Sequence, residues 1–461
     1  MNIKKLLIEA ENKGADFSDI RILNSESEKI SVKNDDIDSI QKDLNSQYGI
    51  RVFHKGGWGF SYGNNENEIG KYFDKALKMA KINSNMLKEK IKLKNFKTYQ
   101  DKIKTKGESF TNFDIKERID KLVNLSKKTE HKNLINKQIV TLFLRKEHQY
   151  MNNFGADIYQ ESEHFNFYFK GVGKKDSKIR EIFTRKGMCA SYDVFKKLDL
   201  DRIVHEELER FKTLFIARKA PAGKFPIVLN NSLSEVFFHE AVGHACEADA
   251  VLKNASVLKE KIGKKIAPDF LTLSDDPSLK TSHGFFVYDD EGIKAKKTKM
   301  IENGVFKNYL QSIETANRMN TELTGNGRAQ NAICFPYPRM SNTVLKKRDF
   351  SIEELFEGIK KGIYAKESSG GVVEPTNGNF LFGAKEGYLI ENGKITKPLL
   401  DVSFGGNILT ILNKIEKIAD DSLMGFPGFC GKRGQIVPVG GMSPHIKISE
   451  AMVGGDNGNI E

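Results

Sequence analysis

The sequence predicts an α+β protein with an N-terminal α/β lobe built on an antiparallel sheet and a strand-rich C-terminal domain. Alternation of apolar and polar residues, typical of half-buried strands, recurs along the chain of 461 residues. Helical periodicity occurs in separate segments, the longest of them over residues 198–217. Asn303-Gly304 and Asn392-Gly393 predict tight hairpin turns in the second half.

Residues 1–85 are predicted to form an N-terminal α+β domain. Two segments of helical period enclose four segments of strand character, and Lys55-Gly56 marks a hairpin turn between the last two strands. In order, the predicted elements are a helix over 2–13, strands over 19–24, 29–33, 47–55 and 57–62, and an amphipathic helix over 69–82.

Residues 86–220 are predicted to form a linker and a central strand meander with helices. The linker covers residues 86–112, which are polar and rich in lysine. Phe165, Phe167 and Phe169 alternate with polar residues and mark one face of a strand. In order, the predicted elements are a helix over 114–128, strands over 139–145, 149–154, 157–171 and 179–192, and a helix over 198–217. The Pro- and Gly-containing segment 220–223 separates this region from a C-terminal domain over residues 221–461.

Composition argues against several classes of protein. The net charge is +12, but the lysines are dispersed, which favours a general compositional bias over a nucleic-acid-binding surface. The sequence lacks both an apolar run of the ~20 residues that span a membrane and the pattern of a signal peptide, so we expect a cytoplasmic protein without a membrane partner. Four cysteines without close pairing indicate reduced thiols. They are Cys189, Cys246, Cys334 and Cys430.

The segment Phe237–Asp249 has the strongest chemical signal, the pattern His-Glu-x-x-x-His from His239 to His244. Two imidazoles and a carboxylate at this distance can hold a divalent metal ion and assist a water molecule. On a regular α-helix, residues at i and i+5 lie about 140° apart. Both rings therefore reach one metal only if the helix widens locally into a π-bulge, and Gly243 lies where that distortion would fall. The alternative is two unrelated histidines on an amphipathic helix. In either case Ser232 or Ser234 is the expected cap of the helix that carries the motif.

The chain resembles the TldD/PmbA family of metallopeptidases, on its metal-bearing TldD-like branch, over most of its length. The matching segments are Tyr48–Val52, Gly57–Phe60, Ala220–Lys224, the His-Glu-Ala-Val-Gly-His motif at 239–244 with Glu247–Asp249, Asp289–Gly292, Thr324–Arg328, Pro338–Thr343, Phe382–Tyr388 and Cys430–Gln435. This resemblance implies that residues 221–461 are a metallopeptidase domain.

The resemblance also implies a ligand set of His239, His244 and Cys430 for one Zn²⁺ ion per chain. Two imidazoles and one thiolate leave a fourth position open, as a catalytic zinc site requires. Glu240 would act as the general base. Cys246 competes for the role of third ligand, but two residues beyond His244 on a helix it points away from that ring. Glu247 and Asp249 either orient a histidine or are solvated carboxylates.

The expected function is zinc-dependent hydrolysis of peptide bonds in unstructured peptides or small disordered proteins, as in TldD-like members of the family. A peptide can add as a strand to a sheet edge, and Gly370-Gly371 permits close backbone approach, although ordinary turn geometry is the favoured explanation of these glycines. The resemblance implies a homodimer, or a heterodimer with a metal-free PmbA-like paralogue. The alternatives are a non-catalytic, metal-stabilised partner subunit of a peptidase complex and a basic nucleic-acid-associated regulator.

Overall fold

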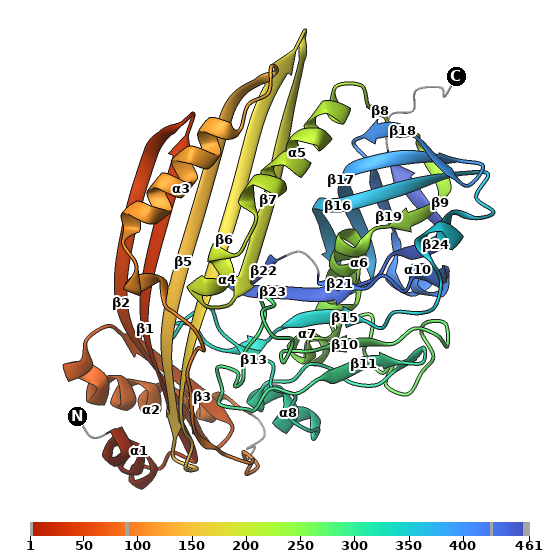
Figure 1. Ribbon diagram of the computed structural model, residues 1–461. Helices are drawn as coiled ribbons and strands as arrows, with labels where there is room; N and C mark the ends of the chain where they lie inside the picture. The colour runs from red at the N-terminus through yellow and green to blue at the C-terminus, as the bar shows by residue number, and fades with distance from the viewer. Residues whose placement is uncertain (1–2, 88–91, 425–426, 455–461) are drawn as a thin grey trace.

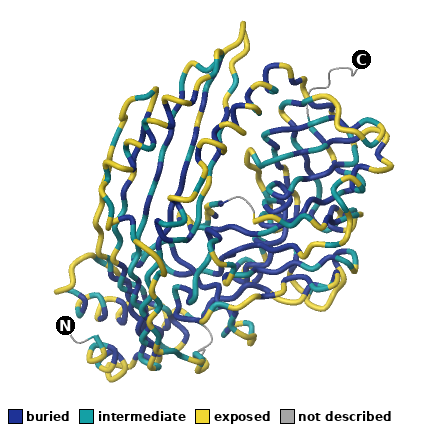
Figure 2. The backbone as a smooth tube through the Cα atoms, viewed as in Figure 1, coloured by how far each residue is buried: buried dark blue, intermediate teal, exposed yellow. Residues whose placement is uncertain are grey.

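The computed structural model describes residues 3–87, 92–424 and 427–454 and confirms the α+β class. Two lobes lie side by side, with long strands on one side and shorter strands around helix α6 on the other (Figure 1). The long strands are buried where they meet the second lobe and become exposed towards their far ends (Figure 2). Over the described residues the helices are α1 Ile3–Asn12, α2 Ile69–Met86, α3 Ile115–Lys128, α4 Tyr192–Lys196, α5 Leu200–Leu214, α6 Asn231–Phe238, α7 Ala248–Leu252, α8 Ile313–Met319, α9 Ile352–Phe356 and α10 Ile408–Asn413.

One sheet forms the first lobe. Its strand order, within the described residues, is β3-β2-β1-β5-β6-β4, with β7 also paired to β6. The strands are β1 Phe17–Lys33, β2 Asp36–His54, β3 Gly57–Gly63, β4 Gln100–Ile103, β5 Leu134–Asn152, β6 Asp157–Lys175 and β7 Lys178–Cys189. Because β1 pairs with β5 from Asp19 to Lys33, the predicted boundary at residue 85 falls inside this single sheet.

Several predicted bounds in this lobe need correction. The segments predicted as separate strands at 19–24 and 29–33 form the single strand β1, and those at 139–145 and 149–154 form β5. Polar residues inside these strands look like turns in sequence, but backbone pairing on both sides keeps β1 extended. Part of the predicted linker is the strand β4, which runs parallel to β6. The predicted helix over 198–217 is shorter, as α5, and the short helix α4 precedes it.

Helices α3 and α5 cover one face of the first sheet. Phe165, Phe167 and Phe169 on β6 pack in one buried cluster with Leu122 of α3 and Phe211 of α5, as the alternating phenylalanines predict. The opposite face of β7 carries Phe183 and Arg185, because successive side chains of a strand alternate between faces. That opposite face looks towards the second lobe.

Two larger sheets and one short pair of strands form the second lobe. One sheet contains β10 Leu273–Asp275, β11 Thr298–Glu302, β12 Val305–Phe306, β15 Asn342–Leu345, β21 Leu423–Met424, β22 Gly428–Lys432 and β23 Gln435–Ser443. The other contains β8 Arg218–Lys219, β9 Gly223–Leu229, β16 Lys361–Glu374, β17 Asn379–Glu391, β18 Lys394–Leu400, β19 Ser403–Asn407, β20 Ile415–Ile418 and β24 Ile446–Gly454; the short pair is β13 Gly327–Arg328 and β14 Tyr337–Pro338. Because β16 pairs with both β9 and β17, the strands β16, β9, β24, β19 and β17 close into a ring.

The predicted hairpin turns in this lobe are present. Asn303 and Gly304 join β11 to β12, and both have positive φ, at 48° and 77°. Asn392 and Gly393 join β17 to β18 with φ of 51° and 77°. Positive φ at both central residues is the geometry that Asn-Gly favours in a tight hairpin.

Helix α6 packs against the closed set of strands through Phe237. The centroid of its aromatic side chain lies 5.5 Å from that of Phe380. The predicted caps Ser232 and Ser234 are wrong, since the side chain of Asn230 accepts the hydrogen bond from the Leu233 amide. Asn230 is the residue directly before the helix, and its extended backbone lets its side chain accept a hydrogen bond from the first turn. The helix is thereby fixed at its start and along its buried face.

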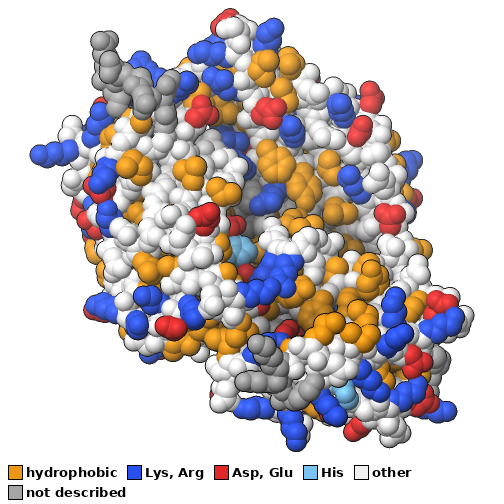
Figure 3. All heavy atoms as spheres, turned by 180° about the vertical axis from the view of Figure 1, so that it is seen from behind, with side chains coloured by type: hydrophobic (Ala, Val, Ile, Leu, Met, Phe, Trp, Pro, Cys, Tyr) orange, Lys and Arg blue, Asp and Glu red, His pale blue; other side chains and the backbone are white. Residues whose placement is uncertain are grey.

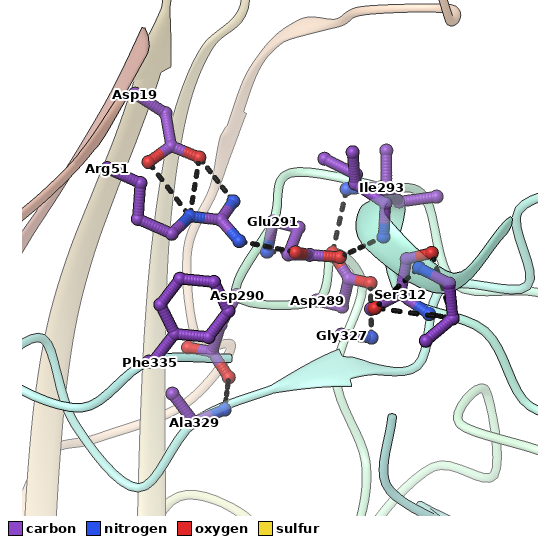
Figure 4. Close-up of polar contacts among 12 residues, drawn as sticks. Asp19, Arg51, Asp289, Asp290, Glu291, Ile293, Ser312, Gly327, Ala329 and Phe335 are labelled. Atoms are coloured by element: carbon purple, nitrogen blue, oxygen red, sulfur yellow. Dashed lines mark hydrogen bonds and ion pairs between the residues drawn. The ribbon is translucent and has the colours of Figure 1, made fainter. Parts of the chain in front are cut away.

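A buried ion-pair network joins the two lobes (Figure 4). Arg51 on β2 donates to Asp19 on β1, at 3.1 and 3.2 Å from its Nε atom, and to Glu291 of the second lobe at 2.5 Å. The second carboxylate oxygen of Glu291 accepts from the Ile313 amide at 2.6 Å, and the Tyr150 hydroxyl donates to Asp19. The side chains of Arg51, Asp19 and Glu291 are at most 1% exposed. Arg51 thus neutralises two carboxylates that water cannot reach.

Replacing Arg51 with Met is therefore expected to destabilise the protein by ~3–5 kcal/mol, because it leaves buried carboxylates without their cation. The free energy of unfolding in urea measures the effect. Arg145→Met is the control: Arg145 pairs with Glu147 at 2.8 Å, but both side chains are about one third exposed, so its loss should cost at most ~1 kcal/mol. Equal effects of the two substitutions would contradict the role of Arg51.

Candidate metal centre

The helix that carries His239 widens as the histidine spacing predicts. After α6 the backbone forms a π-helical turn over His239–Gly243 and then a 3₁₀ turn over His244–Cys246. The wider turn brings the two imidazoles to one side, with ring centroids 5.4 Å apart. Gly243 leaves room for the buried side chain of Met340, since a Cβ atom there would lie 1.8 Å from the Met340 sulfur. The prediction of a local π-bulge at Gly243 is confirmed.

Cys430 approaches the two histidines from the opposite side. It lies on β22, which pairs with β23 in a hairpin, and its Sγ atom is 3.6 Å from Nε2 of His244. The described part of the chain brings one ligand atom each from His239, His244 and Cys430 within 4.8 Å of one another. Such convergence of two nitrogens and one sulfur fits a zinc ion.

The surroundings of Cys430 favour the ionised form of its thiol. Burial opposes its ionisation, but hydrogen bonds with His239 and His244 outweigh burial and lower the pKa of the thiol to about 5. The thiolate is the form of cysteine that binds metals. Cys246, by contrast, is fully buried among apolar side chains, and burial raises the pKa of its thiol well above the usual value. Its side chain packs in the core, away from the three converging ligand atoms.

Glu247 orients the ring of His244. Its carboxylate lies 3.1 Å from Nδ1 of His244, and its side chain is 3% exposed. Burial opposes ionisation of Glu247, but the charges of His244 and Lys432 outweigh it and lower the pKa of the carboxyl to about 2. A carboxylate on the far nitrogen of a histidine fixes which nitrogen is left for a metal. Asp249 contacts Lys432 and Arg433, at 2.6 and 3.1 Å.

Glu240 lies at the edge of a pocket that opens beside the three ligand residues. Its Oε2 atom is 3.5 Å from Nε2 of His244, and its side chain is 32% exposed. The pocket has a volume of about 370 Å³. Seen from behind, the surface is hollowed near the middle of the molecule, and histidine atoms show there beside basic and acidic side chains (Figure 3). Glu240 can therefore reach both the metal position and a bound substrate.

Both lobes contribute to the pocket. Phe183 and Arg185 come from β7 of the first lobe, whereas Lys385 and Phe429 come from the second. The sequence gives no local signal for Phe183, Arg185 and Phe429, whereas Lys385 lies in the segment Phe382–Tyr388 that matches the family. Lys432 and Arg433 lie in a segment that matches the family, but nothing in that segment predicts their contacts. Those contacts arise because β22, which carries both Cys430 and Lys432, lies beside Glu247.

The family to which this chain belongs follows from comparison with known proteins. Residues 222–455 match the model of the PmbA/TldA metallopeptidase C-terminal domain, and residues 18–80 match PmbA/TldA metallopeptidase domain 1. The chain therefore belongs to the TldD/PmbA family of metallopeptidases, as the sequence motifs predict.

Known relatives agree with this assignment. A metalloprotease of Methanocaldococcus jannaschii is 40% identical, over 92% of this chain and 94% of its own length. A zinc metalloprotease TldD homolog of Saccharolobus solfataricus is 31% identical, over 98% and 99%. The crystal structure of TldE from Thermococcus kodakarensis matches with a TM-score of 0.79 at 22% identity, over 98% of this chain and 99% of that one. At that identity the TldE structure supports the fold alone. Among the described residues no helix is long and apolar enough to cross a membrane.

Proposed function

We propose that this protein is a zinc-dependent peptidase that hydrolyses peptide bonds in unstructured chains. The observation that carries the proposal is the convergence of His239, His244 and Cys430 at a pocket, with Glu240 beside them. A closed structural site would need a fourth protein ligand. Within the described residues the group of potential ligands contains three, which favours the catalytic role over the metal-stabilised partner subunit.

A zinc ion bound by these three residues would polarise the scissile carbonyl and make a water molecule more acidic. Glu240, whose Oε2 atom lies 3.5 Å from Nε2 of His244, would take up a proton from the attacking water. Its carboxyl would then return that proton to the departing nitrogen, so that the amine leaves neutral. Glu247 meanwhile holds His244 in one orientation throughout the reaction.

An open strand edge at the pocket supports an extended peptide as substrate. Within the described residues β9 pairs with β16 only from Ile363 to Ala365, so that side of β16 is unpaired further along. Residues 368–371 of this edge line the pocket together with His239 and Glu240. A peptide can add there as a strand through main-chain hydrogen bonds, which select for an extended backbone more than for sequence.

The enzyme should cleave an unfolded protein far faster than the same protein in its native state, because a folded domain cannot present an extended strand to β16. A reduced, alkylated protein and its native form provide the two substrates, and cleavage is followed by mass spectrometry. The Glu240→Gln variant, purified in parallel, controls for contaminating proteases. Equal cleavage of the two forms would contradict this choice of substrate.

The active form is proposed to be a dimer, either of two copies or with a metal-free PmbA-like paralogue. The first lobe supplies Phe183 and Arg185 to the pocket but none of the converging ligand atoms. Walls of this kind can exclude folded proteins from the site, and a second subunit would enclose it further. Activity should fall on dilution as light scattering records dissociation. Full activity of a clearly monomeric sample would refute the requirement for a dimer.

A further inference from the structure

Lys432 lies between the strand and the helical segment that carry the metal ligands. Its ammonium group is 3.0 Å from Glu247 Oε2, 2.6 Å from Asp249 Oδ1 and 3.0 Å from the carbonyl oxygen of Pro338. The three contacts use all three N–H donors of a lysine. The side chain is 13% exposed, and its partners Glu247 and Asp249 are 3% and 10% exposed. Water therefore competes little with these contacts.

The contacts of Lys432 continue to a ligand residue. The oxygen of Glu247 that accepts from Lys432 also lies 3.1 Å from Nδ1 of His244. Lys432 itself follows Cys430 by two residues on β22, so the two side chains leave the strand on the same side. One continuous path of contacts thus runs from the Cys430 strand through Lys432 and Glu247 to the His244 ring.

A second cation supports the same arrangement. The guanidinium of Arg339 donates to the carbonyl oxygen of Cys430, and its Nε atom is 4.0 Å from Glu247 Oε1. Arg339 is fully buried. Arg339 fixes the backbone of β22 at Cys430. Lys432, two residues later, fixes the same strand through the contacts of its own side chain.

We propose that Lys432 is a positioning residue, which acts through Glu247 to fix the His244 ring and the Cys430 strand at the separation that one metal ion needs. The inference rests on the proposed metal site. A surface lysine that merely adds stability would be expected to bind one exposed carboxylate, whereas Lys432 binds two largely buried carboxylates and a carbonyl. Its loss would free the carboxylate of Glu247 to turn away from His244 and would release the strand next to Cys430.

The test compares Lys432→Met with Lys447→Met. Lys447 on β24 is a matched control, since it lies outside the pocket and its side chain is 11% exposed. It pairs with Glu416 on β20 at 3.2 Å. Zinc affinity is measured on the full-length protein by competition with a chelator. Lys432→Met should weaken zinc binding ~10–100-fold, the usual effect of losing a group that orients a ligand, and Lys447→Met should leave it unchanged. If Lys432→Met does not fold, Lys432→Gln, which keeps a polar end, replaces it.

A double-mutant cycle decides whether Lys432 acts through Glu247. Glu247→Gln alone should also weaken zinc binding. The double variant should have about the same zinc affinity as whichever single variant binds zinc less tightly. Losses that simply multiply would show independent effects and overturn the proposal. So would a Lys432→Met protein that unfolds at lower temperature but binds zinc like the parent. A parent protein that binds no zinc at all would instead refute the metal centre itself.

Discussion

Glu240→Gln is expected to abolish most peptidase activity while zinc remains bound. The amide has the shape of the carboxylate but cannot take up a proton from water, and the three ligand residues are unchanged. Losing a general base typically lowers the rate ~10²–10⁴-fold. The measurement is the rate of cleavage of an unfolded peptide at saturating concentration, with zinc content determined on the same sample.

A matched control is available for this substitution. Glu314 on α8 is 31% exposed, close to the 32% of Glu240, and pairs with Arg318 outside the pocket. Glu314→Gln should cleave at the parent rate. If Glu240→Gln also keeps the parent rate, Glu240 is not the base, and the proton must pass to another group at the pocket.

Cys430→Ser is expected to remove zinc, and with it activity, whereas Cys246→Ser should keep both. A serine hydroxyl ionises far less readily than the Cys430 thiol, whose pKa is about 5, so it cannot supply the negative sulfur ligand that a zinc site of this kind uses. Elemental analysis after dialysis should find about one zinc per chain in the parent protein and in Cys246→Ser. The Cys430→Ser protein should lose it.

Cys246→Ser should have a different effect, on stability. Cys246 is fully buried among apolar side chains, so a hydroxyl there costs ~1–3 kcal/mol unless it finds a partner. Its free energy of unfolding should fall while its zinc content stays the same. If zinc is instead lost from Cys246→Ser and kept in Cys430→Ser, the third ligand is Cys246 and the site is local to one helix.

Local patterns in the sequence determined the tight turns and the first half of the site. The turn at Lys55-Gly56 joins β2 to β3 with φ of 46° and 93°, as expected for a hairpin that contains glycine. The spacing from His239 to His244 demanded a wider turn, and the structure has a π-turn there. Such features depend on residues that are neighbours in the chain, so their physical causes can be seen in a short window.

Long-range pairing decided what the sequence alone left open. The residues themselves allowed Cys246 or Cys430 as third ligand, and Cys430, 186 residues from His244, was favoured through family resemblance. Strand pairing between β1 and β5 turned two predicted units into one sheet. The same kind of pairing, between β22 and β23, placed Lys432 against Glu247.

The sequence by itself thus determined the α+β class, the π-turn and the two histidines with Glu240 between them, because helix and strand periods are local properties. Only the tertiary structure decided the shared sheet, the pocket between the lobes and the contacts of Lys432. Each of these depends on which distant strands pair and on which buried charges meet. Which strands pair and which charges meet depends on the free energy of the whole fold, so a short segment of sequence does not determine it.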